Sequence, residues 1–193
     1  MIEQLIGPEL VAGIGAGVAA GAALVKKYGP KLLGEPDVET AVRNFIEAET
    51  DGTIPQSIPV KKSHLKERLS DEYGEAIAEE AYFLDGEYWT TGRRDFEQIR
   101  ALDVIENLPY RPARFDCENY AFLFQTIVAL VFGVNTVGVV LDFEAGHAYN
   151  IVYTNGGSLR LYEPQDAEFV QVGDSLDADE DSEYTLENSV IIF

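Results

Sequence analysis

A cysteine and a histidine in this chain are placed to perform nucleophilic chemistry together. The single cysteine, Cys117, follows Asp116, a residue type that caps helices, so the thiol is expected in the first turn of a helix. Unpaired backbone N–H groups and the helix dipole favour a thiolate at that position. His147 lies 30 residues later, at the start of a β-branched and aromatic run. A thiolate beside an imidazole is the nucleophile and base of acyl-transfer catalysis.

A third group that could orient the imidazole is expected on the strand after His147. Asn155-Gly156-Gly157 joins two β-type segments as a hairpin. Depending on which three residues form the loop, the residue opposite His147 is Glu163 or Gln165. Both share its face, because side chains alternate along a strand. We therefore predict Cys117, His147 and Glu163 as catalytic residues, with Gln165 as a further orienter.

The groups around the cysteine are less defined. The backbone N–H of Cys117 is the first candidate for an oxyanion donor, and the side-chain candidates are Gln98, Trp89 and Tyr110. Asp116 and Glu118 flank the cysteine, and their charges oppose a thiolate unless the carboxylates point away. The other histidine, His64, lies in a highly charged stretch and is expected at the surface without a chemical role.

Four short motifs occur in the order Cys117-Glu118-Asn119-Tyr120-Ala121, Gly133-Val134-Asn135-Thr136-Val137, His147-Ala148-Tyr149 and Glu163-Pro164. This order resembles the transglutaminase-like branch of the papain-fold cysteine enzymes and is similar to small cysteine peptidase domains of tailed viruses. The resemblance covers roughly residues 80–172 and implies a papain-like fold with a Cys-His-acid triad. The orienting acid is Glu163, where Asp is usual in transglutaminase-like enzymes and Asn in papain-like ones.

Composition excludes several classes of protein. A chain of 193 residues fits one main domain plus an appendage. One cysteine cannot form an internal disulfide or a thiolate metal cluster. The acidic stretch 174–187 lacks the spacing of a calcium loop, so no metal site is expected. With 34 acidic and 14 basic residues, the net charge of −20 argues against nucleic acid as a partner. The acids are spread along the chain, which favours a proteome adapted to high salt.

Residues 10–25 form a distinct apolar segment made almost wholly of small and aliphatic residues. Glycines recur every four residues and would give a helix one smooth docking face: Gly13, Gly17 and Gly21. Such a helix is poorly stable alone, so it needs a protein assembly or lipid around it. Glu3 and the lack of a basic leading region argue against a signal peptide. Sixteen residues cover about 24 Å, which is short for a membrane of roughly 30 Å.

The remaining pattern predicts an α+β fold, in which the cysteine helix packs on an antiparallel sheet of four or five strands. Predicted helices cover 37–50, 62–84, 95–105 and the segment from Asp116 to Gly133. Predicted strands cover 136–143, 147–154, 158–163, 167–172 and 189–193. We expect residues 1–34 to dock onto a protein assembly or a membrane. Residues 35–193 are expected to form the main domain, with a helical part (35–110) before the cysteine helix and sheet (111–193).

Two functions remain open. One is a cysteine-dependent acyl-transfer enzyme, that is, a peptidase, an amidase or a transglutaminase-like enzyme, without metal or organic cofactor and with a peptide or other amide as substrate. The alternative is a non-catalytic component of a virion or other particle, docked through residues 1–34 to virion proteins or to its own copies. The expected location is the virion or the cytoplasm of a halophilic host, or a membrane with the main domain on the cytoplasmic side.

Overall fold

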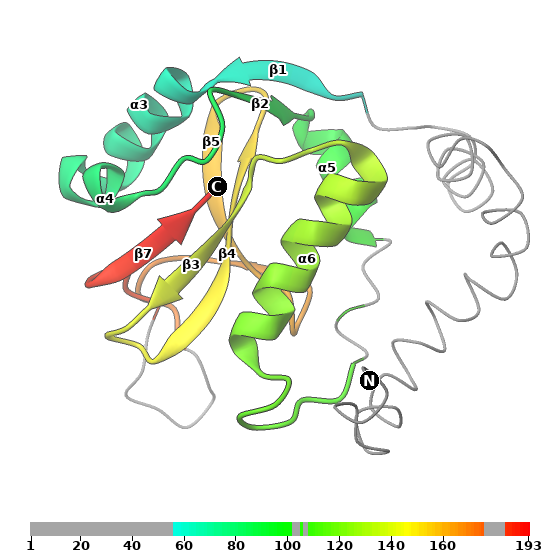
Figure 1. Cartoon of the computed structure of the whole chain (residues 1–193), viewed down its shortest axis with the longest axis vertical. Coiled ribbons are helices and arrows are strands. Elements are labelled where there is room, and N and C mark those ends of the chain that lie inside the picture. Colours follow the sequence, from blue (N-terminus) through cyan, green and yellow to red (C-terminus); the bar gives the residue numbers. More distant parts are fainter. Residues whose placement is uncertain (1–55, 102–104, 106–107, 176–183) are drawn as a thin grey trace, which may run out of the picture.

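The computed structural model describes residues 56–101, 105, 108–175 and 184–193 (Figure 1). The helices in this part are α3 (Lys62–Tyr73), α4 (Glu75–Glu80), α5 (Arg93–Ala101) and α6 (Cys117–Phe132). The strands are β1 (Ile58–Lys61), β2 (Glu87–Thr90), β3 (Val137–Asp142), β4 (His147–Thr154), β5 (Ser158–Glu163), β6 (Glu168–Val170) and β7 (Ser189–Ile192). The predicted docking glycines Gly13, Gly17 and Gly21, the apolar segment 10–25 and the predicted helix 37–50 lie outside the described residues.

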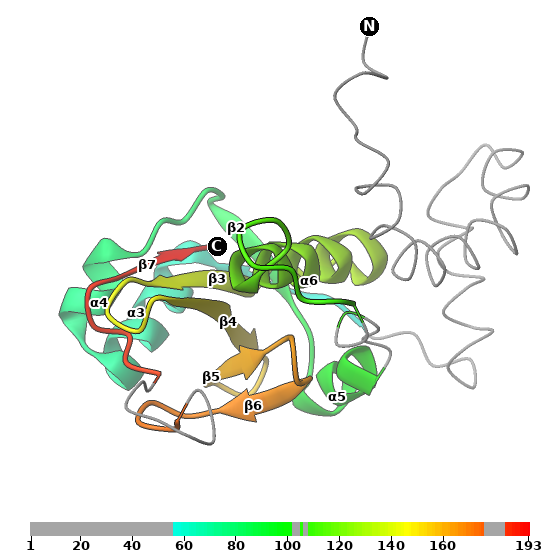
Figure 2. The same cartoon turned by 90° about the horizontal axis from the view of Figure 1, so that it is seen from below.

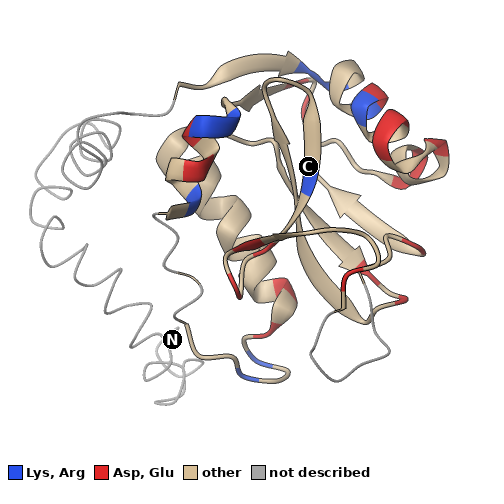
Figure 3. Cartoon of the chain, turned by 180° about the vertical axis from the view of Figure 1, so that it is seen from behind, with Lys and Arg blue, Asp and Glu red and all other residues tan. Residues whose placement is uncertain are grey.

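A five-stranded antiparallel sheet in the order β6-β5-β4-β3-β7 forms the centre of the described structure (Figure 1). The prediction of an α+β fold with a helix on an antiparallel sheet is therefore confirmed. Consecutive strands from β3 to β6 pair with their neighbours in sequence. The last strand, β7, returns to the free side of β3. Acidic side chains are spread over several of these elements (Figure 3).

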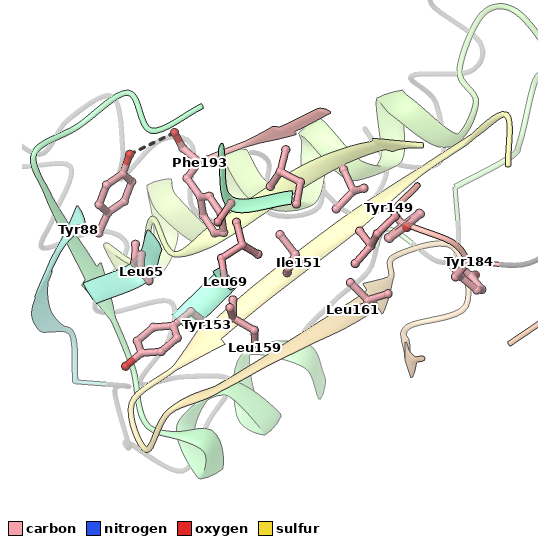
Figure 4. Close-up of a cluster of buried hydrophobic side chains, with 14 residues drawn as sticks. Leu65, Leu69, Tyr88, Tyr149, Ile151, Tyr153, Leu159, Leu161, Tyr184 and Phe193 are labelled. Atoms are coloured by element: carbon pink, nitrogen blue, oxygen red, sulfur yellow. Dashed lines mark hydrogen bonds between the residues drawn. The ribbon is translucent and has the colours of Figure 1, made fainter. Parts of the chain in front are cut away.

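Helices cover both faces of the sheet, with α5 and α6 on one side and α3 and α4 on the other (Figure 2). Each face has its own core because strand residues alternate between the faces. Residues of β4 and β5 that face α3 and α4 include Tyr149, Ile151, Tyr153, Leu159 and Leu161 (Figure 4). Those that face α5 and α6 include Val152 and Tyr162. No helix in the described part of the chain is both long and apolar enough to cross a membrane.

The cysteine helix and the hairpin follow the sequence prediction closely. Helix α6 begins after Asp116, whose backbone N–H donates to the side chain of Asn119 at 3.2 Å, and it ends at the left-handed Gly133 (φ 63°). Strands β4 and β5 have the predicted bounds. Thr154 pairs with Ser158, so the loop is 155–157, the second of the two registers considered.

The region before α6 differs from the prediction. The single helix expected over 62–84 is wrong: it breaks at Gly74, whose φ of 97° is incompatible with a continuing helix. Leu84, at the end of the predicted helix, is 75% exposed. The segments on either side of that helix contain strands β1 and β2, which pair with Pro59 opposite Trp89. Pairing between segments so far apart leaves no local period, which is why the sequence pattern missed it.

Candidate active site

The ends of three elements, α6, β4 and β5, meet at one end of the sheet. Cys117 is the first residue of α6, His147 is the first of β4 and Glu163 is the last of β5. Because β4 and β5 are antiparallel neighbours, the start of one lies beside the end of the other. Figure 1 shows the first turn of α6 at the same end as the β3–β4 turn. The predicted catalytic residues are therefore brought together from separate stretches of sequence.

His147 and Glu163 form a short, largely buried pair. Nε2 of His147 lies 2.7 Å from Oε2 of Glu163, and their side chains are 17% and 3% exposed. The other carboxylate oxygen, Oε1, accepts bonds from the backbone N–H of Gln165 at 3.0 Å and from its side-chain amide at 3.3 Å. Gln165 thus holds Glu163 rather than the imidazole. With Nε2 directed at the carboxylate, Nδ1 is the ring nitrogen left for a thiol.

Two tyrosines pack against the imidazole ring. Tyr149 stacks on His147 with centroids 6.0 Å apart and an angle of 29°, while Tyr184 meets it edge-on at 5.8 Å. The hydroxyl of Tyr184 also donates to Oε2 of Glu163 at 3.0 Å. Both tyrosines belong to the core shown in Figure 4. The ring therefore has little freedom to leave its carboxylate.

Electrostatics favours a protonated imidazole. Burial alone would lower the pKa of His147, but hydrogen bonds to Cys117 and Glu163 and the charges of both groups outweigh it and raise the pKa to about 9. The ring then carries a proton at neutral pH and faces a half-buried thiol. An imidazolium beside Cys117 stabilises the thiolate form of the sulfur.

The two acids that flank the cysteine behave differently. Asp116 turns back, and its Oδ2 accepts the backbone N–H of Ala113 at 2.8 Å. Glu118 does not point away: the thiol of Cys117 donates to its Oε2 at 3.6 Å. The sulfur therefore has two competing neighbours. The carboxylate of Glu118 favours the neutral thiol and the imidazolium of His147 favours the thiolate.

The predicted oxyanion donors are placed unequally. Tyr110 stacks on Tyr120 at 6.4 Å, and partial burial together with the charges of Cys117, Asp116 and Glu118 raises its pKa, so its hydroxyl remains a donor beside the thiol. Trp89 is at the other end of α6, where its backbone bonds to Asn135. Gln98 lies on α5, and its Oε1 is buried without a hydrogen-bond partner in the described structure. Of the three side chains, Tyr110 is the one placed beside the cysteine.

Two residues of this site were not predicted from the sequence. Tyr184 lies in the stretch 174–187, whose many acids indicate a solvated loop. Its backbone is fixed by bonds from Gly173 N–H at 2.9 Å and to the carbonyl of Asp174 at 3.1 Å. Asp142, the last residue of β3, is 2% exposed. Two signals in the sequence could have indicated these residues. Tyr184 is the lone aromatic residue of an acidic stretch, and Asp142 is an acid at the end of an apolar strand.

A groove of about 500 Å³ lies away from the cysteine, between α6, Leu84 and the C-terminal Phe193. It is lined at its α6 side by Gln125, Ala129 and Leu130. Among the described residues, no group of three or more His, Cys, Asp or Glu side chains is placed to hold a metal ion.

Comparison with known proteins corrects the family assignment. No family model matches the chain, and no curated protein matches it. One similar solved structure is described as "PSL1a-E64 complex", with a TM-score of 0.49, 19% identity, 70% of this chain covered and 51% of the other. Another is Polyporus squamosus lectin bound to a human-type influenza-binding epitope, with a TM-score of 0.46, 19% identity, 58% of this chain covered and 45% of the other.

The chain therefore spans about half the length of the solved structures that it matches. Neither description names a transglutaminase-like enzyme or a viral peptidase domain, and no family model matches, so the assignment to the transglutaminase-like and papain-fold enzymes is corrected: the comparisons assign this chain to no family. Of the fold prediction, the structure shows the coarser part, an α+β fold with a five-stranded antiparallel sheet.

Proposed function

We propose that this protein is a cysteine-dependent acyl-transfer enzyme that acts on an amide or ester carbonyl. One observation carries the proposal: Cys117, His147 and Glu163 come from three separate stretches and meet in contact, with the acid 2.7 Å from the ring. A nucleophile, a base and an orienting acid in this order are what acyl transfer requires.

The chemistry follows from the proton positions. The thiolate of Cys117 attacks the carbonyl carbon, and a C–S bond forms. His147, protonated at neutral pH, gives its proton to the leaving amine or alkoxide as the bond to the carbonyl carbon breaks. The resulting thioester is cleaved by water or by an amine, whose proton returns to His147. Glu163 keeps the ring oriented throughout.

The developing oxyanion needs donors near the sulfur. The backbone N–H of Cys117, at the first position of α6, adds to the partial positive charge of the helix N-terminus. The hydroxyl of Tyr110, whose pKa burial and the charge of Cys117 raise, is the second candidate donor. Removing one such donor typically costs about 100-fold or more in rate, so Tyr110→Phe distinguishes a donor from a bystander.

The test uses the single cysteine of the chain as its reporter. The full chain is mixed with p-nitrophenyl acetate, and both nitrophenolate release and acetylation of Cys117 are followed, the latter by intact mass. We expect a burst of nitrophenolate, one acetyl group on Cys117 and turnover afterwards. Cys117→Ser removes the burst, and His147→Gln slows acetylation by roughly 100-fold or more.

His64 supplies a matched control, since it is the other histidine of the chain. It lies on α3, and its Nε2 bonds to the hydroxyl of Tyr153 at 2.9 Å. His64→Gln should leave acetylation unchanged. A wild-type thiol that reacts no faster than free cysteine, or equal rates in His147→Gln and His64→Gln, would rule out catalysis at this site.

A non-catalytic component of a multiprotein particle is the second candidate. Glu118 against the sulfur opposes the thiolate, and apolar side chains near the groove are strongly exposed, Leu84 at 75% and Leu130 at 67%. Exposed apolar residues around a groove favour a protein partner. An inert thiol in the acetylation experiment, together with a defined oligomer that Leu130→Asp dissociates, would favour this candidate.

A further inference from the structure

The buried carboxylate of Asp142 has no part in the proposed chemistry, yet it lies next to the site. It ends β3, directly opposite His147 in the β3–β4 register. On its other side it pairs with Ser189 of β7. Its 2% exposure means that it must find its hydrogen-bond donors within the protein.

Five donors satisfy this carboxylate. Oδ1 accepts the backbone N–H of Ala145 at 3.0 Å, and both oxygens lie 3.0 Å from Oγ1 of Thr185. Oδ2 accepts the hydroxyl of Tyr149 at 3.0 Å. It also accepts the backbone N–H groups of Thr185 and Leu186, each at 3.1 Å. These bonds lower the pKa of Asp142 although burial opposes them, so the group is ionised at neutral pH.

The donors belong to the three groups that surround His147. Ala145 lies in the turn that leads into His147. Tyr149 is the ring on which the imidazole stacks. Thr185 directly follows Tyr184, which meets the ring edge-on and bonds to Glu163. One carboxylate thus ties together the approach to the imidazole, one of its aromatic neighbours and the segment that carries the other.

We propose that Asp142 is a positioning residue for the His147–Glu163 pair, and that it acts by fixing Tyr149 and Tyr184 against the imidazole. Its role in turnover rests on the proposed function, whereas its hold on the ring does not. When the carboxylate of Asp142 is lost, the segment that follows Tyr184 loses its bonds from Thr185 and Leu186, and the phenol is held less closely against Glu163. The 2.7 Å contact between Glu163 and His147 then lengthens, and the charge interaction that raises the pKa of His147 weakens.

The experiment titrates the histidines of the full-length chain by NMR, since there are two and His64 is an internal reference. In Asp142→Asn we expect the pKa of His147 to fall from about 9 toward its ordinary value of about 6.5. Acetylation of Cys117 should slow by about tenfold in kcat with KM unchanged, as expected when a bond to a charged group is lost. Asp85→Asn, which removes one charge beside Asn135 at the far end of α6, is the control and should change neither.

Two milder variants separate positioning from the mere loss of a charge. Tyr149→Phe and Thr185→Val each remove one donor and leave Asp142 ionised, so both should lower the pKa of His147 by a smaller amount. They also decide the question if Asp142→Asn does not fold. An unchanged titration of His147 in the folded variants overturns the positioning role. Loss of acetylation in the wild-type protein, with the titration moving as expected, removes the proposed function and leaves the positioning of the ring in place.

Discussion

The hydroxyl of Tyr184 donates to the same oxygen of Glu163 that faces His147, at 3.0 Å and 2.7 Å respectively. Oε2 therefore sits between a phenol and an imidazole, and the phenol fixes where the carboxylate can be. Burial, together with the charge of Glu163, raises the pKa of Tyr184, so its hydroxyl stays protonated and a donor at neutral pH. Tyr184 therefore orients Glu163, and Glu163 in turn orients His147.

Tyr184→Phe isolates that bond. The ring contact with His147 is kept, while the donor to a buried carboxylate is lost, so we expect unfolding free energy to fall by about 1–3 kcal/mol. Acetylation of Cys117 should slow by about tenfold. Urea denaturation and the burst assay measure the two effects. Tyr73→Phe, whose hydroxyl bonds to Leu159 at 3.5 Å away from the site, is the control, and equal losses in both variants would contradict a special role for Tyr184.

The pH dependence of stability should carry the signature of His147. Its folded pKa of about 9 is raised above the unfolded value of about 6.5, so its contribution is full below 6.5 and is lost as pH rises through 9. The contribution is about 3 kcal/mol for a side chain only 17% exposed. Urea unfolding between pH 6 and pH 10 should show the decline in the wild type and in His64→Gln. A decline of the same size in His147→Gln would contradict this assignment.

Glu118 is expected to restrain the nucleophile. Its Oε2 accepts a hydrogen bond from the thiol at 3.6 Å, and its negative charge favours the neutral thiol. Glu118→Gln removes that charge and should speed alkylation of Cys117 by iodoacetamide several-fold at pH 7. Glu118 is exposed, so the fold should not suffer. Glu87→Gln, an exposed acid on β2, is the matched control. A slower reaction in Glu118→Gln would mean that Glu118 assists the thiol instead.

Gly138 marks a close contact between β3 and the C-terminus. A Cβ there would lie 2.9 Å from Ile151 and 3.0 Å from Phe193, which is too near for either side chain to stay in place. Gly138→Ala should therefore cost about 1–3 kcal/mol of unfolding free energy through overpacking. Gly86→Ala meets nothing within 4 Å and serves as the control. The measurement is the thermal melting temperature of each variant. An equal fall in Gly138→Ala and Gly86→Ala would refute the contact.

Asn150 connects the cysteine helix to the sheet. Its side-chain amide donates to the carbonyls of Ala121 at 2.9 Å and Gly138 at 3.1 Å, one turn along α6 from Cys117. Asn150→Ala leaves both carbonyls buried without that donor, so a loss of about 2–3 kcal/mol is expected. Calorimetry measures it, and acetylation of Cys117 should fall in parallel as the helix start loosens. If Asn150→Ala keeps its stability but its Cys117 is acetylated more slowly, Asn150 positions the cysteine helix without stabilising the fold.

The parts of the fold that local patterns encode were predictable from the sequence. Helix α6 has a cap at Asp116, helical periodicity and a left-handed Gly133, and β4 and β5 have a turn of Asn and Gly between alternating residues. Cys117, His147 and Glu163 could be proposed because each sits at the end of one of these elements. The two candidate registers also limited the residue opposite His147 to two choices, and the structure selects Gln165 by extension of the β4–β5 pairing.

Long-range relations were not encoded in this way. Nothing local predicts that the segment holding Pro59 pairs with the one holding Trp89, or that β7 returns to β3. Tyr184 and Asp142 belong to the site only through tertiary contacts. In the sequence, Tyr184 lies in an acidic stretch, and Asp142 has the pattern of an ordinary strand end. The family assignment failed for a related reason, because short motifs constrain spacing along the chain and not the whole arrangement of layers.

Two backbone bonds between Tyr184 and the pair Gly173 and Asp174 close the base of the acidic stretch before it reaches the site. The backbone of Tyr184 is therefore held by residues that precede the stretch. Doubling the length of such a segment costs only about 0.6 kcal/mol in closure entropy. Insertions between Ser175 and Glu183 should therefore leave the bond between Tyr184 and Glu163 in place, and with it the acetylation rate of Cys117.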